Sequence, residues 1–246
     1  MNPRSIINLF SVLVLFFSCS YIFPLIVSFI YDDSSAHLFF IPFLAIAFLG
    51  GLSFLLTRGN TKDLSQKDGF VIIVLFWVVL GFAGSIPFYL NGMSFTDAIF
   101  ESMSGITTTG ATTIADIQSL PESLLFFRQL LQWMGGMGLI VLAIAVMPLL
   151  GIGGGQLHKT DIPGAMGDQR LTPRIKETAQ ALWIIYVGLT VICALLYLLN
   201  GMSVFDAISH AMSTVAIGGF STYNESIGYF NSLSIEIICM SFMILS

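Results

Sequence analysis

Long apolar runs constrain this chain more than any other feature of its sequence. Five of them are long enough to cross a bilayer as helices of about 20 residues. They lie at residues 6–30, 38–56, 70–90, 124–150 and 179–199. A sixth begins near Leu233 and is still apolar at Ser246, so we expect a last helix that is cut short. Only 9% of the residues are charged, whereas soluble domains carry about 25%. The sequence therefore predicts an all-α membrane protein.

The positive charges predict how the helices are oriented. Eight of the nine Lys and Arg lie in segments that alternate to one side of the predicted helices. Positive loops remain in the cytoplasm, so this side is predicted to be cytoplasmic, together with the N-terminus. The ninth, Arg128, is expected near the outer start of a helix. The protein is then a multi-pass protein surrounded by membrane lipid.

Two segments between these helices, 91–121 and 201–231, must begin and end on the outer side for this topology to hold. Each contains a partly apolar stretch, 95–106 or 204–217, that is too short to span the bilayer. We therefore expect each segment to enter the membrane, turn back and leave on the side from which it came.

These two segments are copies of one unit. Residues 91–114 and 200–223 are identical at eleven of 24 positions, with an offset of 109 and no gap. In each copy a serine, Ser94 or Ser203, is placed to cap a short helix. The repeat predicts two units of helix, re-entrant short helix, loop and helix.

The loop after each short helix is the candidate ion-binding site. The C-terminal end of a helix carries partial negative charge, which favours a cation, and carbonyls that follow it can replace the hydration shell of potassium. The candidate residues are Thr107, Thr108, Thr109, Gly110, Ala216, Ile217, Gly218 and Gly219, with the carbonyls of Thr108, Thr109, Ile217 and Gly218 as the potassium ligands. The alternative is a pair of ordinary re-entrant loops whose glycines only permit close packing.

Two charged residues are candidates for supporting this site. Arg128 is predicted to pair with Glu101 or Glu122 and brace the loop, or else to extend its charge to the membrane surface. Glu101 and His210 occupy equivalent positions of the repeat and are expected to cap or brace the short helices rather than to bind the ion.

Four motifs are typical of one known family. They are SMSGITTTGAT at 102–112, RQLLQWMGGMGL at 128–139, LTPRIKETAQA at 171–181 and AIGGFST at 216–222. On these residues the chain resembles the Trk/Ktr/HKT superfamily of potassium transporters, most closely its bacterial TrkH branch. The resemblance covers the whole chain.

The resemblance implies a potassium-channel-like fold in which four helix–pore-loop–helix units surround one pore. This chain would supply two of the four, preceded by two extra transmembrane helices. Each unit of the family has one key glycine, which matches Gly110 and Gly219, and glycine in both loops implies selectivity for K⁺. The family also implies the bacterial inner membrane, a homodimer and a cytosolic nucleotide-binding regulatory subunit of the TrkA type. That subunit would dock on the basic segments 58–67 and 159–176.

The expected division is then two N-terminal helices (1–58), a first unit (69–150), a cytoplasmic linker (151–177) and a second, truncated unit (178–246). Potassium uptake is the predicted function, with this chain forming half of a pore. The alternative is a non-conducting partner or regulatory fragment of a transporter. An enzyme is not expected, because the three histidines are scattered and no HExxH motif or paired intramembrane aspartates are present. No nucleic-acid partner is expected.

Overall fold

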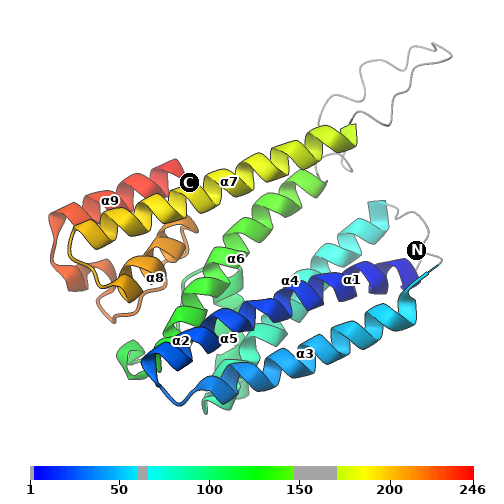
Figure 1. Ribbon diagram of the computed structural model, residues 1–246, viewed down its shortest axis with the longest axis horizontal. Helices are drawn as coiled ribbons and strands as arrows, with labels where there is room; N and C mark the ends of the chain where they lie inside the picture. The colour runs from blue at the N-terminus through cyan, green and yellow to red at the C-terminus, as the bar shows by residue number, and fades with distance from the viewer. Residues whose placement is uncertain (1–2, 60–65, 147–170) are drawn as a thin grey trace, which may run out of the picture.

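The computed structural model describes residues 3–59, 66–146 and 171–246, and all regular secondary structure in these ranges is helical (Figure 1). The helices are α1 (Pro3–Ser18), α2 (Ile22–Tyr31), α3 (Ala36–Thr57), α4 (Gln66–Leu90), α5 (Phe95–Ile106), α6 (Glu122–Val146), α7 (Leu171–Leu199), α8 (Val204–Val215) and α9 (Leu233–Leu245). The predicted all-α architecture is confirmed for this part of the chain.

Four helical stretches are long and apolar enough to span a membrane, namely Pro3–Tyr31, Ala36–Thr57, Val71–Leu90 and Glu177–Leu199. Only 22% to 39% of their most apolar windows is buried inside the protein. Large apolar side chains such as Phe48 (69% exposed) and Ile184 (72% exposed) point outward instead. Outward-facing apolar surface of this extent marks contact with a membrane.

The fourth and the sixth of the predicted apolar runs and the expected linker can be compared with these helices. The run at 124–150 corresponds to α6, although its last residues, 147–150, lie outside the described ranges, as do residues 151–170 of the expected linker. Residues 171–177 of that linker begin α7. The short sixth run forms α9, with 13 residues.

The first three helices form a hairpin, in which α1 and α2 run beside α3 (Figure 1). The Tyr21 hydroxyl donates a hydrogen bond to the Ala83 carbonyl of α4 at 2.7 Å. The Tyr21 ring stacks on Phe127 of α6, with centroids 5.5 Å apart. In the turn between α2 and α3, Asp33 accepts a hydrogen bond from the N–H of Ser123 at 2.9 Å. These contacts fix the hairpin to α4 and α6.

Helices α4–α5–α6 and α7–α8–α9 repeat one order, in which a short helix of 12 residues stands between two others. Ser94 accepts the N–H of Asp97 at 3.1 Å, and its hydroxyl donates to the Asp97 carboxylate at 2.6 Å. Ser203 and Asp206 make the same two bonds, at 3.0 and 2.7 Å. Both predicted N-caps are confirmed.

Helix α6 lies between the two short helices, because glycines let it approach both (Figure 1). A Cβ on Gly135 would lie 2.0 Å from the Ile106 carbonyl oxygen at the end of α5. A Cβ on Gly136 would lie 3.3 Å from the Cα of Ala216, just after α8. These glycines therefore permit close packing, and one helix contacts the ends of both short helices.

Candidate ion-binding site

The first loop (residues 107–114) and the second loop (residues 216–223) leave their short helices in the same way. In each, the N–H groups of the second and third residues after the helix bond back to its last turn, as in a Schellman motif. The four bonds measure 2.8 to 3.0 Å and join Thr108 to Gly105, Thr109 to Ser104, Ile217 to Thr214 and Gly218 to Ser213. N–H groups of each loop thus bond to the last carbonyls of the short helix. The carbonyls of the loop residues themselves take no part in these four bonds.

Both loops place their second and fourth residues in the left-handed region. The φ angles are 55° at Thr108 and 76° at Gly110, and 51° at Ile217 and 83° at Gly219. Glycine adopts this region freely, but a β-branched isoleucine is strained there. Such strain persists where the surroundings impose it and is often found at functional sites. The two loops therefore share an unusual backbone at equivalent positions of the repeat.

The loops meet at Gly110 and Gly218. A Cβ on Gly110 would lie 2.1 Å from the carbonyl oxygen of Gly218 and 3.4 Å from the Cα of Gly219. Only a residue without a side chain fits this approach. The two candidate quartets, about 109 positions apart in the sequence, are therefore neighbours in space.

The eight candidate residues differ in exposure. Thr107, Thr109, Ile217 and Gly219 are exposed, Thr108 and Gly110 are partly exposed, and Ala216 and Gly218 are buried. The Thr107 hydroxyl donates to the Met103 carbonyl at 2.7 Å and lies 2.8 Å from the hydroxyl of Thr109. The exposed residues are accessible at the surface of the protein, whereas Ala216 and Gly218 are packed inside it.

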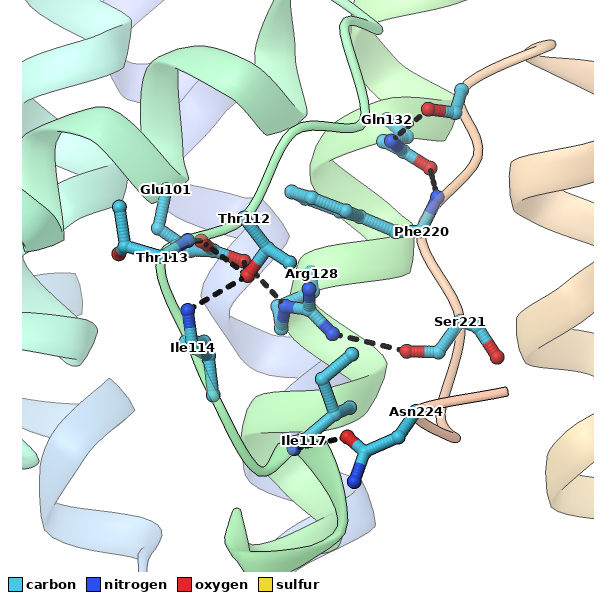
Figure 2. A network of polar contacts seen from close by, with 11 residues as sticks. Glu101, Thr112, Thr113, Ile114, Ile117, Arg128, Gln132, Phe220, Ser221 and Asn224 are labelled. Carbon is cyan, nitrogen blue, oxygen red and sulfur yellow. Dashed lines mark hydrogen bonds and ion pairs between the residues drawn. The ribbon is translucent and has the colours of Figure 1, made fainter. Parts of the chain in front are cut away.

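Arg128 pairs with Glu101 (Figure 2). Its Nε lies 2.7 Å from the Glu101 carboxylate, and both side chains are fully buried. Glu101 also accepts the hydroxyl of Thr112 at 2.9 and 3.1 Å. Of the two proposed partners the structure brings Glu101 to Arg128, and burial rules out a position at the membrane surface. The pair supports the first loop from behind.

The same arginine reaches the second loop. Its Nη1 donates to the Ser221 carbonyl at 3.0 Å, and its guanidinium carbon lies 4.2 Å from the centre of the Phe220 ring. Figure 2 shows Arg128 on α6 between the two loops. One side chain therefore connects both loops.

Gln132, one turn further along α6, also holds the second loop. Neither this residue, nor its partner Phe220, nor Ser221, which Arg128 contacts, was singled out from the sequence. A signal was present, since an amide inside an otherwise apolar spanning run is costly without a partner. Its partner was not foreseeable, because 86 positions separate Gln132 from Gly218.

His210 takes the place of Glu101 in the second unit. Its Nδ1 lies 2.9 Å from the Asp206 carbonyl, and its Nε2 lies 3.0 Å from the hydroxyl of Ser221. Since a carbonyl only accepts, Nδ1 carries the proton and Nε2 accepts from Ser221. Ser221 is the repeat equivalent of Thr112. The sequence predicts that both residues cap or brace the short helices; each instead reaches a hydroxyl of the following loop, and only the first does so with a charge.

Backbone oxygens are the donors that the site offers. Within the described ranges, no group of three or more His, Cys, Asp or Glu side chains could hold a metal ion. Potassium is readily coordinated by carbonyl oxygens, and the non-helical backbone of both loops provides such oxygens.

Outward-facing apolar helices and two equivalent loops that meet between them define an integral membrane protein built from a duplicated helical unit. Residues 35–246 match the family model TrkH, described as cation transport protein. The chain belongs to this TrkH family, and it is a member of a transport family rather than an enzyme.

Individual relatives agree with this assignment. The chain is 50% identical over 249 residues to the Trk system potassium uptake protein TrkH of Halomonas elongata, covering all of this chain and 52% of that protein. It is 44% identical over 248 residues to TrkG of Escherichia coli, covering all of this chain and 51% of that protein. The crystal structure of the potassium transporter TrkH from Vibrio parahaemolyticus matches with a TM-score of 0.87 at 46% identity, over all of this chain and 50% of that one. The chain spans about half the length of the curated relatives it matches.

Proposed function

We propose that this chain supplies two of the four filter loops of a potassium-uptake pathway in the bacterial inner membrane, and therefore half of the pore. One observation carries the proposal most directly, namely that two loops of matching backbone geometry contact each other at Gly110 and Gly218. Two chance re-entrant loops would not need equivalent left-handed residues or a shared contact.

In this proposal the ion is the substrate and is held by main-chain oxygens. The carbonyls of Thr108, Thr109, Ile217 and Gly218 are the ligands, and Gly110 and Gly219 give the backbone the freedom to present them. The Gly218 oxygen already accepts a hydrogen bond from Gln132 and keeps its second lone pair for the ion.

The electrostatics of the short helices support a cation at this place. The C-terminal ends of α5 and α8 lie directly before the loops, and a helix carries about half a negative charge at that end. Inward flux would be driven by the membrane potential, which contributes about 2.3 kcal/mol per charge for each 100 mV.

The arrangement of the complete protein belongs to the same proposal. The relatives are named as parts of the Trk system, which supports a TrkA-type regulatory subunit on the cytoplasmic side. The N-terminus lies on that side in this proposal because the positive charges of the chain favour it. A homodimer of a four-unit protein is the expected assembly. The basic segments 58–67 and 159–176, proposed for docking, lie largely outside the described ranges.

Rubidium uptake tests the transport function. Vesicles that contain the complete transporter, with this chain in it, should take up rubidium when the inside is negative. Gly110→Ser should lower the preference for potassium over sodium, because a side chain at this position displaces the Gly218 carbonyl.

Gly228→Ser is the matched control, since that glycine has a negative φ and open space around it. Absence of uptake by the unaltered protein would favour the non-conducting partner or regulatory fragment. An unchanged ion preference in Gly110→Ser would reject the filter assignment.

A further inference from the structure

The backbone of residues 218–221 needs hydrogen-bond partners from elsewhere in the protein. Gly218, Phe220 and Ser221 are buried, and irregular backbone inside a membrane protein is stable only where its polar groups are satisfied. The Gly218 N–H bonds to the Ser213 carbonyl at the end of α8, whereas the Gly218 carbonyl, the Phe220 N–H and the Ser221 carbonyl meet side chains of α6.

Gln132 supplies two of these partners with a single amide. Its Nε2 donates to the Gly218 carbonyl at 2.6 Å, and its Oε1 accepts from the Phe220 N–H at 3.0 Å. The side chain is fully buried, and a Cβ on Gly218 would lie 2.3 Å from its amide carbon. The two bonds hold the two peptide planes on either side of Gly219, whose φ is 83°.

Two neighbours on α6 continue this contact along the loop. With its amide oriented to match its neighbours, Gln129 donates to the Phe220 carbonyl at 3.1 Å and accepts from the Ser221 N–H at 3.3 Å. Arg128 donates to the Ser221 carbonyl at 3.0 Å. Residues separated by three or four positions share one face of a helix, so these side chains reach the loop together.

The second unit lacks equivalent groups on its own last helix. Helix α9 contains no Arg and no Gln, whether it is aligned to α6 by the offset of 109 or by the start of each helix. The contact of Arg128, Gln129 and Gln132 with the second loop is therefore not a general property of the duplicated unit. It joins the first unit to the loop of the second.

We propose that Gln132 is a positioning residue that determines ion preference by fixing the two peptide planes around Gly219. This inference rests on the proposed filter function. Gln132 does not touch the ion; it acts through the backbone of the second loop. When its bonds are lost, the Gly218 carbonyl is free to turn, and the site adapts to the smaller sodium ion. The first unit of the chain thus sets the selectivity of the loop in the second.

Three variants of the complete transporter test this role. Gln132→Met keeps the length of the side chain but makes neither bond, and Gln132→Glu keeps only the acceptor for the Phe220 N–H. Tyr21→Phe is the matched control, because it removes a buried side-chain hydrogen bond from the N-terminal hairpin to the Ala83 carbonyl of α4. Rubidium uptake into vesicles is measured in competition with potassium and with sodium.

We expect Gln132→Met to lower the potassium-to-sodium ratio by about threefold to tenfold, a change of the size that one ordinary hydrogen bond contributes, because Arg128 and Gln129 still hold part of the loop when both bonds of Gln132 are lost. Gln132→Glu should show a smaller decrease, and Tyr21→Phe should leave the ratio unchanged even if it lowers abundance. A general loss of stability changes the amount of active protein but not this ratio.

The outcomes separate the two proposals. Uptake by the unaltered protein with a wild-type ratio in Gln132→Met would overturn the role of Gln132 and leave the transport function standing. If Gln132→Met does not reach the membrane, the ratio of Gln132→Glu decides in the same way. No rubidium uptake by the unaltered protein would reject the transport function, and this inference with it.

Discussion

At the residue scale, Gly110 and Gly219 share a left-handed backbone but not their surroundings. A Cβ on Gly110 would meet the Gly218 carbonyl, whereas a Cβ on Gly219 would have nothing within 4 Å. The two glycines are equivalent in the repeat, so sequence alone treats them alike. At both positions the left-handed backbone favours glycine. Only at Gly110 would a side chain also collide with the neighbouring loop.

Alanine at these two positions should therefore have unequal effects. Gly219→Ala should cost about 1–2 kcal/mol, the cost of a left-handed residue other than glycine. Gly110→Ala should cost more, because the Gly218 backbone must also move. Thermal unfolding of the purified protein measures both effects, and Gly92→Ala, with a positive φ and open space, is the control for backbone strain alone. Equal losses at Gly110 and Gly219 would contradict the contact between the loops.

The pair formed by Glu101 and Arg128 allows a second prediction at this scale. Arg128→Met should destabilise the protein by about 3–5 kcal/mol, because it leaves a buried carboxylate without its partner. Adding Glu101→Gln should recover part of the loss, since the neutral amide oxygen still accepts from Thr112. Denaturant unfolding of the two single variants and the double variant gives the coupling energy. A double variant that is no more stable than Arg128→Met would show that the charge pair is unimportant.

At the scale of helices, α6 combines two functions that are separate along its length. Its first half carries the polar side chains that hold the loops, and Gly135 and Gly136 follow where it passes the ends of α5 and α8. A helix with larger residues at those positions would stand further from both short helices. Arg128 and Gln132 would then no longer reach the second loop.

The glycines of α6 should therefore differ in their tolerance of alanine. Gly135→Ala places a Cβ 2.0 Å from a backbone oxygen, so we expect lower membrane abundance and a lower unfolding temperature. Gly138→Ala should be tolerated, because its Cβ would lie 3.7 Å from the Phe76 ring, an ordinary contact. Both changes give α6 the same gain in helix propensity, so a difference between them reports packing. Equal stability of the two variants would argue against the close approach of α6 to α5.

Local signals account for what the sequence predicted at this scale. The short helices and their caps could be predicted from Ser94 and Ser203, because an N-cap depends on neighbouring residues only. The repeat shows the same local pattern twice. The contacts of Gln132, Phe220 and Ser221 depend on which helix face meets which loop, and tertiary packing decides that. The choice of Glu101 over Glu122 for Arg128 has the same origin, because α5 lies behind the first loop.

At the scale of the whole molecule, the two loops are covered to different extents. In the second loop Gly218 and residues 220–222 are buried, although Ile217 and Gly219 are exposed, whereas residues 109, 111, 112 and 113 of the first loop are all exposed. The proposed ring of four units gives a reason for this difference, since a further unit could cover the first loop as α6 covers the second. The N-terminal hairpin, by contrast, packs on α4 and α6 within this chain.

Asp33 joins that hairpin to the first unit and predicts how their attachment depends on pH. Burial acts to raise the pKa of this carboxyl, but hydrogen bonds from Ser123, Ser28 and Ser35 outweigh it and hold the pKa below its usual value. Since the folded pKa is the lower one, the ionised group stabilises the fold at neutral pH. This stabilisation is lost as the pH falls below about 4 and through the folded pKa.

Asp33→Asn should therefore lower the unfolding temperature of the detergent-solubilised protein at pH 7, because the amide loses the charge-assisted bond to the first turn of α6. The difference from the unaltered protein should shrink as the pH is lowered below the usual carboxyl pKa of about 4 and on through the lower folded pKa of Asp33, where Asp33 itself becomes protonated. Asp32→Asn removes the same charge from the exposed neighbour and should have little effect at either pH. A difference that stays constant across this range would mean that Asp33 contributes through its shape and not through its charge.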